Sequence, residues 1–309
     1  MFGVGAREAR WRTAVWRVAD PKITLASMSS LFLGACAAAR DGAIPWAWLG
    51  VTVAGIFFLE AAKNASGEVF DWDSGADQAV AEADRSPFSG GKRVLVDGLL
   101  TRRQTLAMAA AFYSLGIAAG FLVVALREPR VLWFGAAGVA LAFFYHAPPL
   151  RLSYRGLGEL AVALAYGPLI AGGCYLVLRG ALPAWVLWAP APLALLVAAF
   201  LWINEFPDAR ADEAARKRTL VVRLGRRRAA DAFAVIVAAA LALVALLPLL
   251  GVPRGVWLGL VAAVPAVRAV LRLREAPEDT PRIVPAQGWT LLSFVVFALG
   301  AGLGVAAIR

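Results

Sequence analysis

Two groups of acidic residues carry the most informative spacing in this sequence. In the segment NEFPDARADEAARKRTLVVRLG, Asn204, Asp208 and Asp212 follow one another at steps of four. A helix that continues past Pro207 would hold all three side chains on one face. Two carboxylates beside an amide suit a hard cation such as Mg2+ that also binds a phosphate-bearing ligand. A cationic group follows closely and consists of Lys217, Arg218, Arg223, Arg226, Arg227 and Arg228.

The other acidic group lies earlier in the chain, within the longest hydrophilic stretch. Asn64, Glu68 and Asp71 fall at positions i, i+4 and i+7 of one helical face, and Asp73 and Asp77 follow near a glycine. Positions 64 and 68 precede their counterparts in the later group by 140 residues, which hints at an ancient duplication. This group has basic partners of its own in Arg85, Lys92 and Arg93. For either group alone, a solvated charged loop at the end of a membrane helix is the alternative interpretation.

The elements that position these groups are apolar runs long enough to cross a bilayer. The chain has 309 residues, of which 61% are hydrophobic, and a positive mean hydropathy. A soluble domain is nearer half apolar, so the composition predicts an all-α, polytopic membrane protein with one domain over residues 1–309. We expect a bundle of nine transmembrane helices near residues 22–40, 44–62, 104–126, 131–147, 157–178, 183–204, 229–250, 255–273 and 286–308.

The net charge of +10 is distributed by side of the membrane. The N-terminus and the loops after the even-numbered spans hold 25 of the 31 Lys and Arg residues. This asymmetry places the N-terminus and both acidic groups on the cytoplasmic side, as an acidic cap on the bundle. The basic balance therefore reflects orientation in a membrane, and we expect no nucleic-acid partner.

Other reactive residues give weaker signals. Cys36 and Cys174 are isolated in apolar runs and are expected to be buried structural thiols. His146 is the only histidine, which argues against a zinc site or a Ser-His-Asp triad. The SGGKR stretch lacks the spacing of a phosphate-binding P-loop and is better described as a flexible glycine turn that presents Lys92 and Arg93.

Taken together, the two acidic groups favour a lipid diphosphate as the ligand. Carboxylates at the ends of membrane helices are costly unless they are paired or bound to a metal, on the order of 2.5–3.5 kcal/mol at the bilayer centre and less near its surface. A diphosphate held by Mg2+ between two such groups would satisfy both, and the apolar bundle beside it would shelter a hydrocarbon tail. The sequence thus predicts a membrane enzyme that acts on a lipid diphosphate.

On these motifs the sequence resembles the UbiA superfamily of intramembrane aromatic prenyltransferases, which have nine helices and two Asp-rich motifs on the cytoplasmic side. The series Asn204, Asp208, Asp212 followed by KRTLVVRLG matches the second motif, and FDWDSGAD matches the end of the first. Within the superfamily, FDWDSGAD, GGKRVLVDGLL, YHAPPLRLSYRGLGEL and KRTLVVRLG are most similar to 1,4-dihydroxy-2-naphthoate prenyltransferases of menaquinone synthesis. The chain departs from the motifs at three places: Gly67-Glu68 replaces Asn-Asp, Glu205 stands where a second Asn is frequent, and Arg216 replaces Gly.

The resemblance implies roles for the site residues. The metal ligands would be Glu68, Asp71, Asp77, Asp208 and Asp212, with Asp71, Asp208 and Asp212 central to catalysis. Asn64 and Asn204 would orient the ligands. The departing pyrophosphate would be neutralised by Lys92, Arg93, Lys217 and Arg218. The aromatic acceptor would meet Arg151, Tyr154 or Arg155, for which interfacial anchoring is the alternative.

The expected protein is therefore an Mg2+-dependent enzyme of the bacterial cytoplasmic membrane. It would transfer a polyprenyl group from an allylic diphosphate to 1,4-dihydroxy-2-naphthoate with loss of the carboxylate. Two alternatives stay open. One is the same chemistry on another acceptor, such as 4-hydroxybenzoate, a tetrapyrrole precursor or a glycerol phosphate lipid. The other is a non-enzymatic transporter or scaffold that uses the acidic groups to bind ions.

Overall fold

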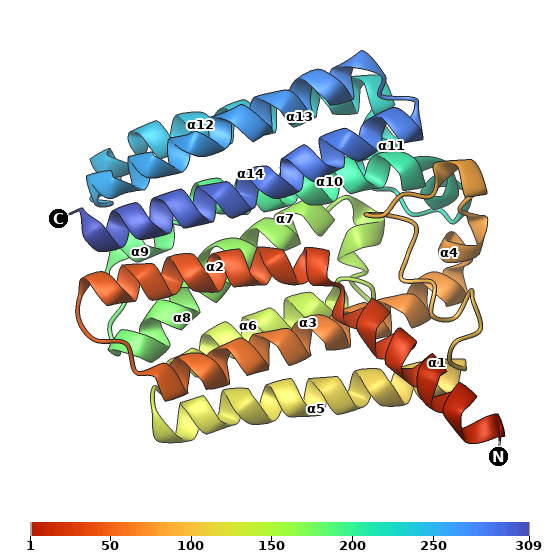
Figure 1. Ribbon diagram of the computed structural model, residues 1–309, viewed down its shortest axis with the longest axis horizontal. Helices are drawn as coiled ribbons and strands as arrows, with labels where there is room; N and C mark the ends of the chain where they lie inside the picture. The colour runs from red at the N-terminus through yellow and green to blue at the C-terminus, as the bar shows by residue number, and fades with distance from the viewer. Residues whose placement is uncertain (1, 309) are drawn as a thin grey trace.

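Apolar helices that lie side by side make up the body of the protein (Figure 1). The computed structural model describes the backbone of residues 2–308 and the side chains of residues 7–308. Within that range there is no β-strand, and eight helical segments are long and apolar enough to cross a membrane. The one remaining predicted span, the fourth at residues 131–147, corresponds to α6 (Val131–Phe144), an apolar helix of 14 residues. The prediction of an all-α polytopic membrane protein is confirmed.

Several spans are single helices and others are interrupted. The uninterrupted spans are α2 (Pro21–Arg40), α3 (Trp46–Ser74), α5 (Arg102–Leu126) and α14 (Thr280–Ala307). A π-helical turn η3 (Ala165–Leu169), which contains Pro168, joins α7 (Gly158–Leu164) to α8 (Ile170–Arg179). The remaining spans pair α9 (Ala184–Trp188) with α10 (Ala191–Ala214), α12 (Arg226–Leu246) with η4 (Leu247–Leu250), and η5 (Arg254–Ala262) with α13 (Ala263–Glu275).

Both acidic groups lie on helices that continue well past the predicted spans. The predicted spans ended at residues 62 and 204, whereas α3 runs to Ser74 and α10 runs to Ala214. Pro207 lies inside α10 without ending it. As a result, the steps of four along each motif do correspond to one helical face.

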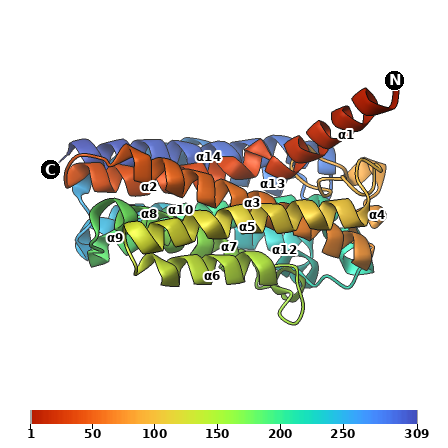
Figure 2. The same cartoon turned by 90° about the horizontal axis from the view of Figure 1, so that it is seen from below.

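Short elements gather at one end of the bundle, which we call the acidic end because both motifs reach it. They are α4 (Ala76–Ala79), η1 (Glu82–Asp84), η2 (Leu152–Arg155) and α11 (Leu220–Leu224). The amphipathic α1 (Phe2–Ala19) leaves the bundle there at an angle, and Trp16 is exposed on it (Figure 2). This placement agrees with an interfacial basic segment.

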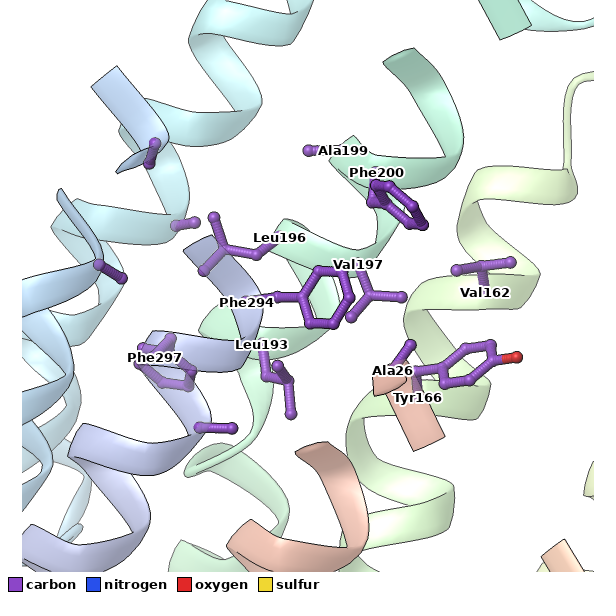
Figure 3. Packing of buried hydrophobic residues seen from close by; sticks show 14 of the residues in the cluster. Ala26, Val162, Tyr166, Leu193, Leu196, Val197, Ala199, Phe200, Phe294 and Phe297 are labelled. Atoms are coloured by element: carbon purple, nitrogen blue, oxygen red, sulfur yellow. The ribbon is translucent and has the colours of Figure 1, made fainter. Parts of the chain in front are cut away.

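Large side chains of α10 and α14 fill the centre of the bundle. Phe294 and Phe297 of α14 pack against Leu193, Leu196 and Phe200 of α10 (Figure 3). Glycines allow the closest helix contacts. A methyl group on Gly255 would lie 2.0 Å from the carbonyl oxygen of Gly304, so η5 and α14 meet through backbone, as small residues permit in membranes. This packing holds α10, and with it the second acidic motif, in place.

Candidate active site

Asp71 lies at the centre of the acidic end and is half-buried, with 14% of its side chain exposed. The Tyr154 hydroxyl donates a hydrogen bond to its Oδ1 at 2.7 Å. Nε2 of His146 lies 3.5 Å from Oδ2, and Nζ of Lys217 lies 3.9 Å from the same oxygen. The imidazole reaches this position because residue 67 is a glycine, where a methyl group would lie 2.7 Å from the ring. The absent side chain at position 67 thus makes room for His146 beside the carboxylate.

Glu68 anchors the loop that follows η1. Its Oε1 accepts hydrogen bonds from the backbone N–H groups of Lys92 and Arg93 at 2.5 and 3.0 Å, and its Oε2 accepts from Val94 and Leu95 at 2.7 and 3.4 Å. Arg93 has a φ of 56°, so successive N–H groups point inward as in an anion-binding nest. Both carboxylate oxygens are therefore occupied by the chain itself.

The second motif on α10 is less committed to protein partners. Oδ2 of Asp208 accepts a hydrogen bond from the Gly90 N–H at 3.2 Å, while its Oδ1 is buried without a partner. Oδ1 of Asp212 lies 3.4 Å from Nζ of Lys217. Asn204 accepts a hydrogen bond from Nε2 of Gln287 on α14 at 3.1 Å, so its amide is held on the side of α14.

Lys217 joins the two motifs. Its ammonium contacts Asp71 of the first and Asp212 of the second, and its backbone N–H donates to the Asp212 carbonyl at 2.7 Å. Burial alone would lower the pKa of Lys217, but the charges of Asp212 and Asp71 outweigh burial and raise it well above its usual value. The lysine is therefore held as a cation between the two helix ends.

Asp77 lies among the other carboxylates on the short helix α4. Burial, and then the negative charges of Asp71 and Glu68, raise the pKa of Asp77 to about 8. The loop presses directly on it, because a methyl group on Gly91 would lie 2.6 Å from Oδ1 of Asp77. Gly91 also has a φ of +72°, a conformation that side chains disfavour. This close approach requires glycine.

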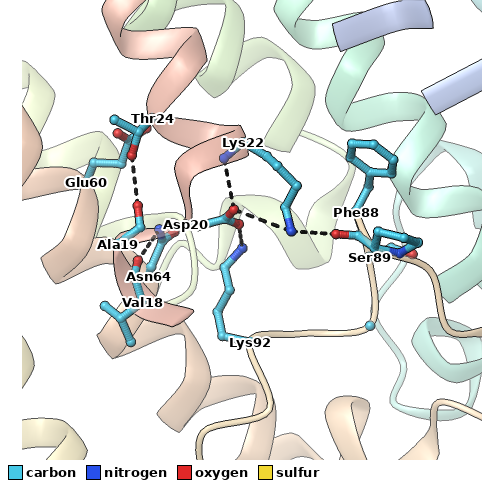
Figure 4. Close-up of polar contacts among 12 residues, drawn as sticks. Val18, Ala19, Asp20, Lys22, Thr24, Glu60, Asn64, Phe88, Ser89 and Lys92 are labelled. Carbon is cyan, nitrogen blue, oxygen red and sulfur yellow. Dashed lines mark hydrogen bonds and ion pairs between the residues drawn. The ribbon is translucent and has the colours of Figure 1, made fainter. Parts of the chain in front are cut away.

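The two loop cations predicted to face the phosphate, Lys92 and Arg93, form ion pairs with carboxylates outside the two acidic motifs. Lys92 forms an ion pair with the buried Asp20 at the junction of α1 and α2 (Figure 4). Arg93 pairs with Asp97 at 2.7 Å. The amide of Asn64 donates to the Val18 carbonyl at 2.9 Å, so it ties α3 to α1 (Figure 4). Glycine turns at positions 90 and 91 are present, but the expected flexible presentation of the two cations is replaced by a loop tied down at several points.

The three residues expected to meet the acceptor separate into two environments. Tyr154 belongs to the site through its bond to Asp71. Arg151 and Arg155 are exposed: the guanidinium of Arg151 lies 5.5 Å from the Tyr154 ring, and that of Arg155 donates to the Pro149 carbonyl at 2.9 Å. Arg218 is also exposed, and its N–H donates to the Tyr154 carbonyl. The structure brings none of the guanidinium groups of Arg151, Arg155 and Arg218 to the carboxylates.

The carboxylates suit a hard divalent cation. Asp208 offers a buried oxygen without a partner, and burial, followed by the negative charges of Asp71 and Glu68, raises the pKa of Asp77. Oxygen donors of this kind are those that Mg2+ prefers. Among the described residues, no three such side chains already form a closed metal site, so phosphate oxygens and water would complete the coordination.

Sequence reasoning missed a second polar group, which lies deeper in the bundle. An apolar cavity is walled by α3, α5, α6 and the α7–α8 span, and its polar lining residues include Glu60 and Lys63. Glu60 accepts hydrogen bonds from Ser27 at 2.8 Å and from the Tyr166 hydroxyl at 2.7 Å. A signal was available, because Glu60 extends the step-of-four series of the first motif by one further turn.

Comparison with known proteins agrees with this architecture. The sequence model described as "UbiA prenyltransferase family" matches residues 27–293. The chain is 32% identical over 211 residues to a 1,4-dihydroxy-2-naphthoate octaprenyltransferase of Mycobacterium tuberculosis, covering 68% of this chain and 71% of that protein. It is 29% identical over 176 residues to the chloroplastic 2-carboxy-1,4-naphthoquinone phytyltransferase of Arabidopsis thaliana, covering 54% of this chain and 43% of that protein.

Some curated relatives are considerably longer than the segment that matches this chain. The chain spans about half of the length of the A. thaliana protein and of a Synechocystis phytyltransferase. Among solved structures, a UbiA homologue from Archaeoglobus fulgidus bound to DMAPP and Mg2+ has the same fold, with a TM-score of 0.66 and 16% identity. That likeness covers 96% of this chain and 99% of the other.

Proposed function

The chain belongs to the UbiA prenyltransferase family, and from this premise we propose that it transfers a polyprenyl group from an allylic diphosphate to an aromatic acceptor. The observation that carries the proposal is the meeting of two acidic helix ends at one site. Lys217 contacts Asp71 of α3 and Asp212 of α10, and the Gly90 N–H contacts Asp208. A polyanion bound with divalent metal is the ligand that such a cluster recognises.

The candidate metal ligands are the five carboxylates named from the sequence, used unequally. Asp71, Asp77, Asp208 and Asp212 surround the site, and Asp71, Asp208 and Asp212 are the proposed catalytic group. Glu68 would join them only by releasing loop N–H groups. Mg2+, when bound with the diphosphate, would supply positive charge to its oxygens. Relatives solved with DMAPP or GPP and Mg2+ are consistent with this assignment.

The protein's own residues would then assist departure of pyrophosphate. Lys217 remains a cation because of its carboxylate neighbours, so it would stabilise charge that develops on the leaving oxygen. Lys92 and Arg93 would contribute after a change of partner from Asp20 and Asp97. Tyr154 would hold Asp71 in one orientation through its hydrogen bond. The apolar cavity would take the tail and exclude water from the allylic cation.

We propose 1,4-dihydroxy-2-naphthoate as the acceptor, with loss of its carboxylate as carbon dioxide. The support is the sequence resemblance of the motifs and the similarity to a relative named for this acceptor. Another aromatic or lipid acceptor is the competing possibility. We further propose that the acidic end faces the cytoplasm of a bacterium, on the strength of the Lys and Arg excess at that end.

The test uses purified full-length protein in liposomes, supplied with a polyprenyl diphosphate, Mg2+ and 1,4-dihydroxy-2-naphthoate. Mass spectrometry should detect a prenylated, decarboxylated product that disappears on chelation and in the Asp208→Ala variant. Release of pyrophosphate with other aromatics but not with the naphthoate would keep the reaction class and overturn the acceptor. Absence of both product and pyrophosphate from folded protein would overturn the enzymatic proposal in favour of an ion-binding transporter or scaffold.

A further inference from the structure

The apolar cavity contains an unusual polar pair at its end nearest the acidic site. Glu60 and Lys63 lie one turn apart on α3, and both line the cavity. Glu60 is eight residues before Glu68, which places it about 12 Å deeper along the helix. None of the four aspartates of the candidate metal site lines this cavity. Glu60 is thus set apart from the carboxylates that would hold the diphosphate, and Lys63 lies between Glu60 and those carboxylates along the helix.

The two charges of the pair are satisfied very differently. Glu60 is 7% exposed and is hydrogen-bonded by Ser27 and Tyr166. Lys63 forms no ion pair with any residue that the structure describes, and its ammonium lies 4.9 Å from the centre of the Tyr145 ring. A cation beside an apolar cavity is costly to keep unless something negative pairs with it. The free ammonium therefore points to an anionic ligand in the cavity.

The neighbouring carboxylate restricts which anion fits. A diphosphate is bound with divalent metal by several carboxylates, whereas Glu60 is the only carboxylate among the residues that line this cavity. A ligand with one carboxylate and a hydroxyl donor matches both groups, since the carboxylate pairs with Lys63 and the hydroxyl donates to Glu60. The remaining walls suit an aromatic ring, because Leu59, Leu141 and Val162 are apolar and Tyr145 offers a flat face.

We propose that Glu60 and Lys63 form the subsite for the acceptor, and that they select an aromatic acid that also carries a ring hydroxyl. This inference rests on the proposed prenyl transfer and adds the residues that recognise the acceptor. It differs from the assignment to Arg151 and Arg155, which are exposed on the outer side of the acidic end. The acceptor ring lies inside the apolar cavity, at the end nearest the diphosphate site, and the prenyl tail takes the remainder of the cavity.

The kinetic test compares two acceptors that differ only by the carboxylate, 1,4-dihydroxy-2-naphthoate and 1,4-dihydroxynaphthalene. In Lys63→Met we expect the KM for the naphthoate to rise on the order of tenfold or more, because a charge-assisted hydrogen bond is lost. The KM values for the diol and for the prenyl diphosphate should change by less than about twofold. Lys63→Arg should restore much of the discrimination, and Glu60→Gln should raise the KM for both acceptors.

A matched control removes a different cation that lies over an aromatic ring. Arg268 is exposed on α13 with its guanidinium 4.8 Å from the Trp289 ring, away from the cavity, so Arg268→Met should leave all three KM values unchanged. Thermal unfolding in detergent checks that every variant is folded. If Lys63→Met raises the KM for the diphosphate, or raises it equally for both acceptors, the subsite assignment is wrong while prenyl transfer stands.

A binding measurement keeps the two proposals distinguishable. Calorimetry with 2-naphthoate, without donor or Mg2+, should show binding to the wild type and to Arg268→Met and at least tenfold weaker binding to Lys63→Met. This result would support the subsite even if no acceptor were turned over. Equal binding of 2-naphthoate to the wild type and Lys63→Met, or no binding to the wild type, would overturn it.

Discussion

The two acidic motifs look alike in sequence but are used differently in the structure. On α3, Glu68 accepts hydrogen bonds from four backbone N–H groups and Asp71 accepts one from Tyr154. On α10, Asp208 keeps a buried oxygen without a partner, and the Asp212 carboxylate contacts the ammonium of Lys217. The first motif binds the backbone of the loop, and the second keeps a carboxylate oxygen available for a ligand. Equal spacing along a helix therefore does not imply equal roles.

The largest expected effect is at the second motif. Asp208→Asn keeps the size of the side chain and its bond to the Gly90 N–H but removes a charge that a divalent cation would bind. We expect kcat/KM to fall about a hundredfold or more, with an increased Mg2+ requirement. Initial rates over a range of Mg2+ concentrations measure both quantities. A change of less than twofold would mean that the free oxygen has no role in metal binding.

The next effect concerns the lysine between the motifs. Lys217→Met removes the only side chain that the structure places in ionic contact with Asp71 and Asp212 together. Because the cation would also meet the diphosphate, we expect the KM for the prenyl donor to rise on the order of tenfold to a hundredfold. Lys217→Arg keeps the charge and should lose less. Equal losses in the two variants would show that geometry, and not charge, is what Lys217 supplies.

A smaller loss of activity is expected at the first motif, together with a change in the loop. Glu68→Gln replaces one acceptor oxygen with an NH2 group that faces backbone donors, which would leave N–H groups unsatisfied at a cost of about 1–3 kcal/mol. Trypsin cleaves after Lys92 or Arg93, so its rate of cleavage there should rise on the order of tenfold. Asp73→Asn on the same helix, which loses an exposed ion pair with Arg102, serves as the control. Unchanged cleavage would contradict the anchoring role of Glu68.

The difference between the motifs also marks the limit of sequence reasoning. The bundle and the shared face of each motif follow from local properties, namely apolar run length and a step of four. The apolar run of the second span ends near residue 62, and the polar motif residues, whose spacing predicts one helical face, continue the same helix to Ser74. Hydropathy indicates which part of a helix lies in the membrane, and it does not indicate whether the helix continues into a polar region beyond the membrane.

Contacts between segments that are distant in the sequence could not be predicted from such local properties. Glu68 meets residues 92–95 only because the loop returns to α3, and Lys92 pairs with Asp20 only because α1 packs there. The path of a loop depends on many weak interactions that leave no periodic pattern. Glu60 differs from these contacts, because its spacing of four from Asn64 can be read from the sequence. It was overlooked because it lies within an apolar run assigned to the membrane.

The smallest effect tests why the first motif departs from the usual Asn-Asp pair. A methyl group on Gly67 would lie 2.7 Å from the His146 ring, whereas one on Gly50, also on α3, would meet no atom within 4 Å. Gly50→Ala should therefore be neutral or stabilising through helix propensity, and Gly67→Ala should lower the thermal unfolding temperature by overpacking. If His146 is the cause, Gly67→Ala should cost less in a His146→Ala background, with a coupling on the order of 1 kcal/mol. Strict additivity of the two changes would instead show that glycine at position 67 serves the backbone of α3. The position of the His146 imidazole beside Asp71 would then not depend on the absence of a side chain at position 67.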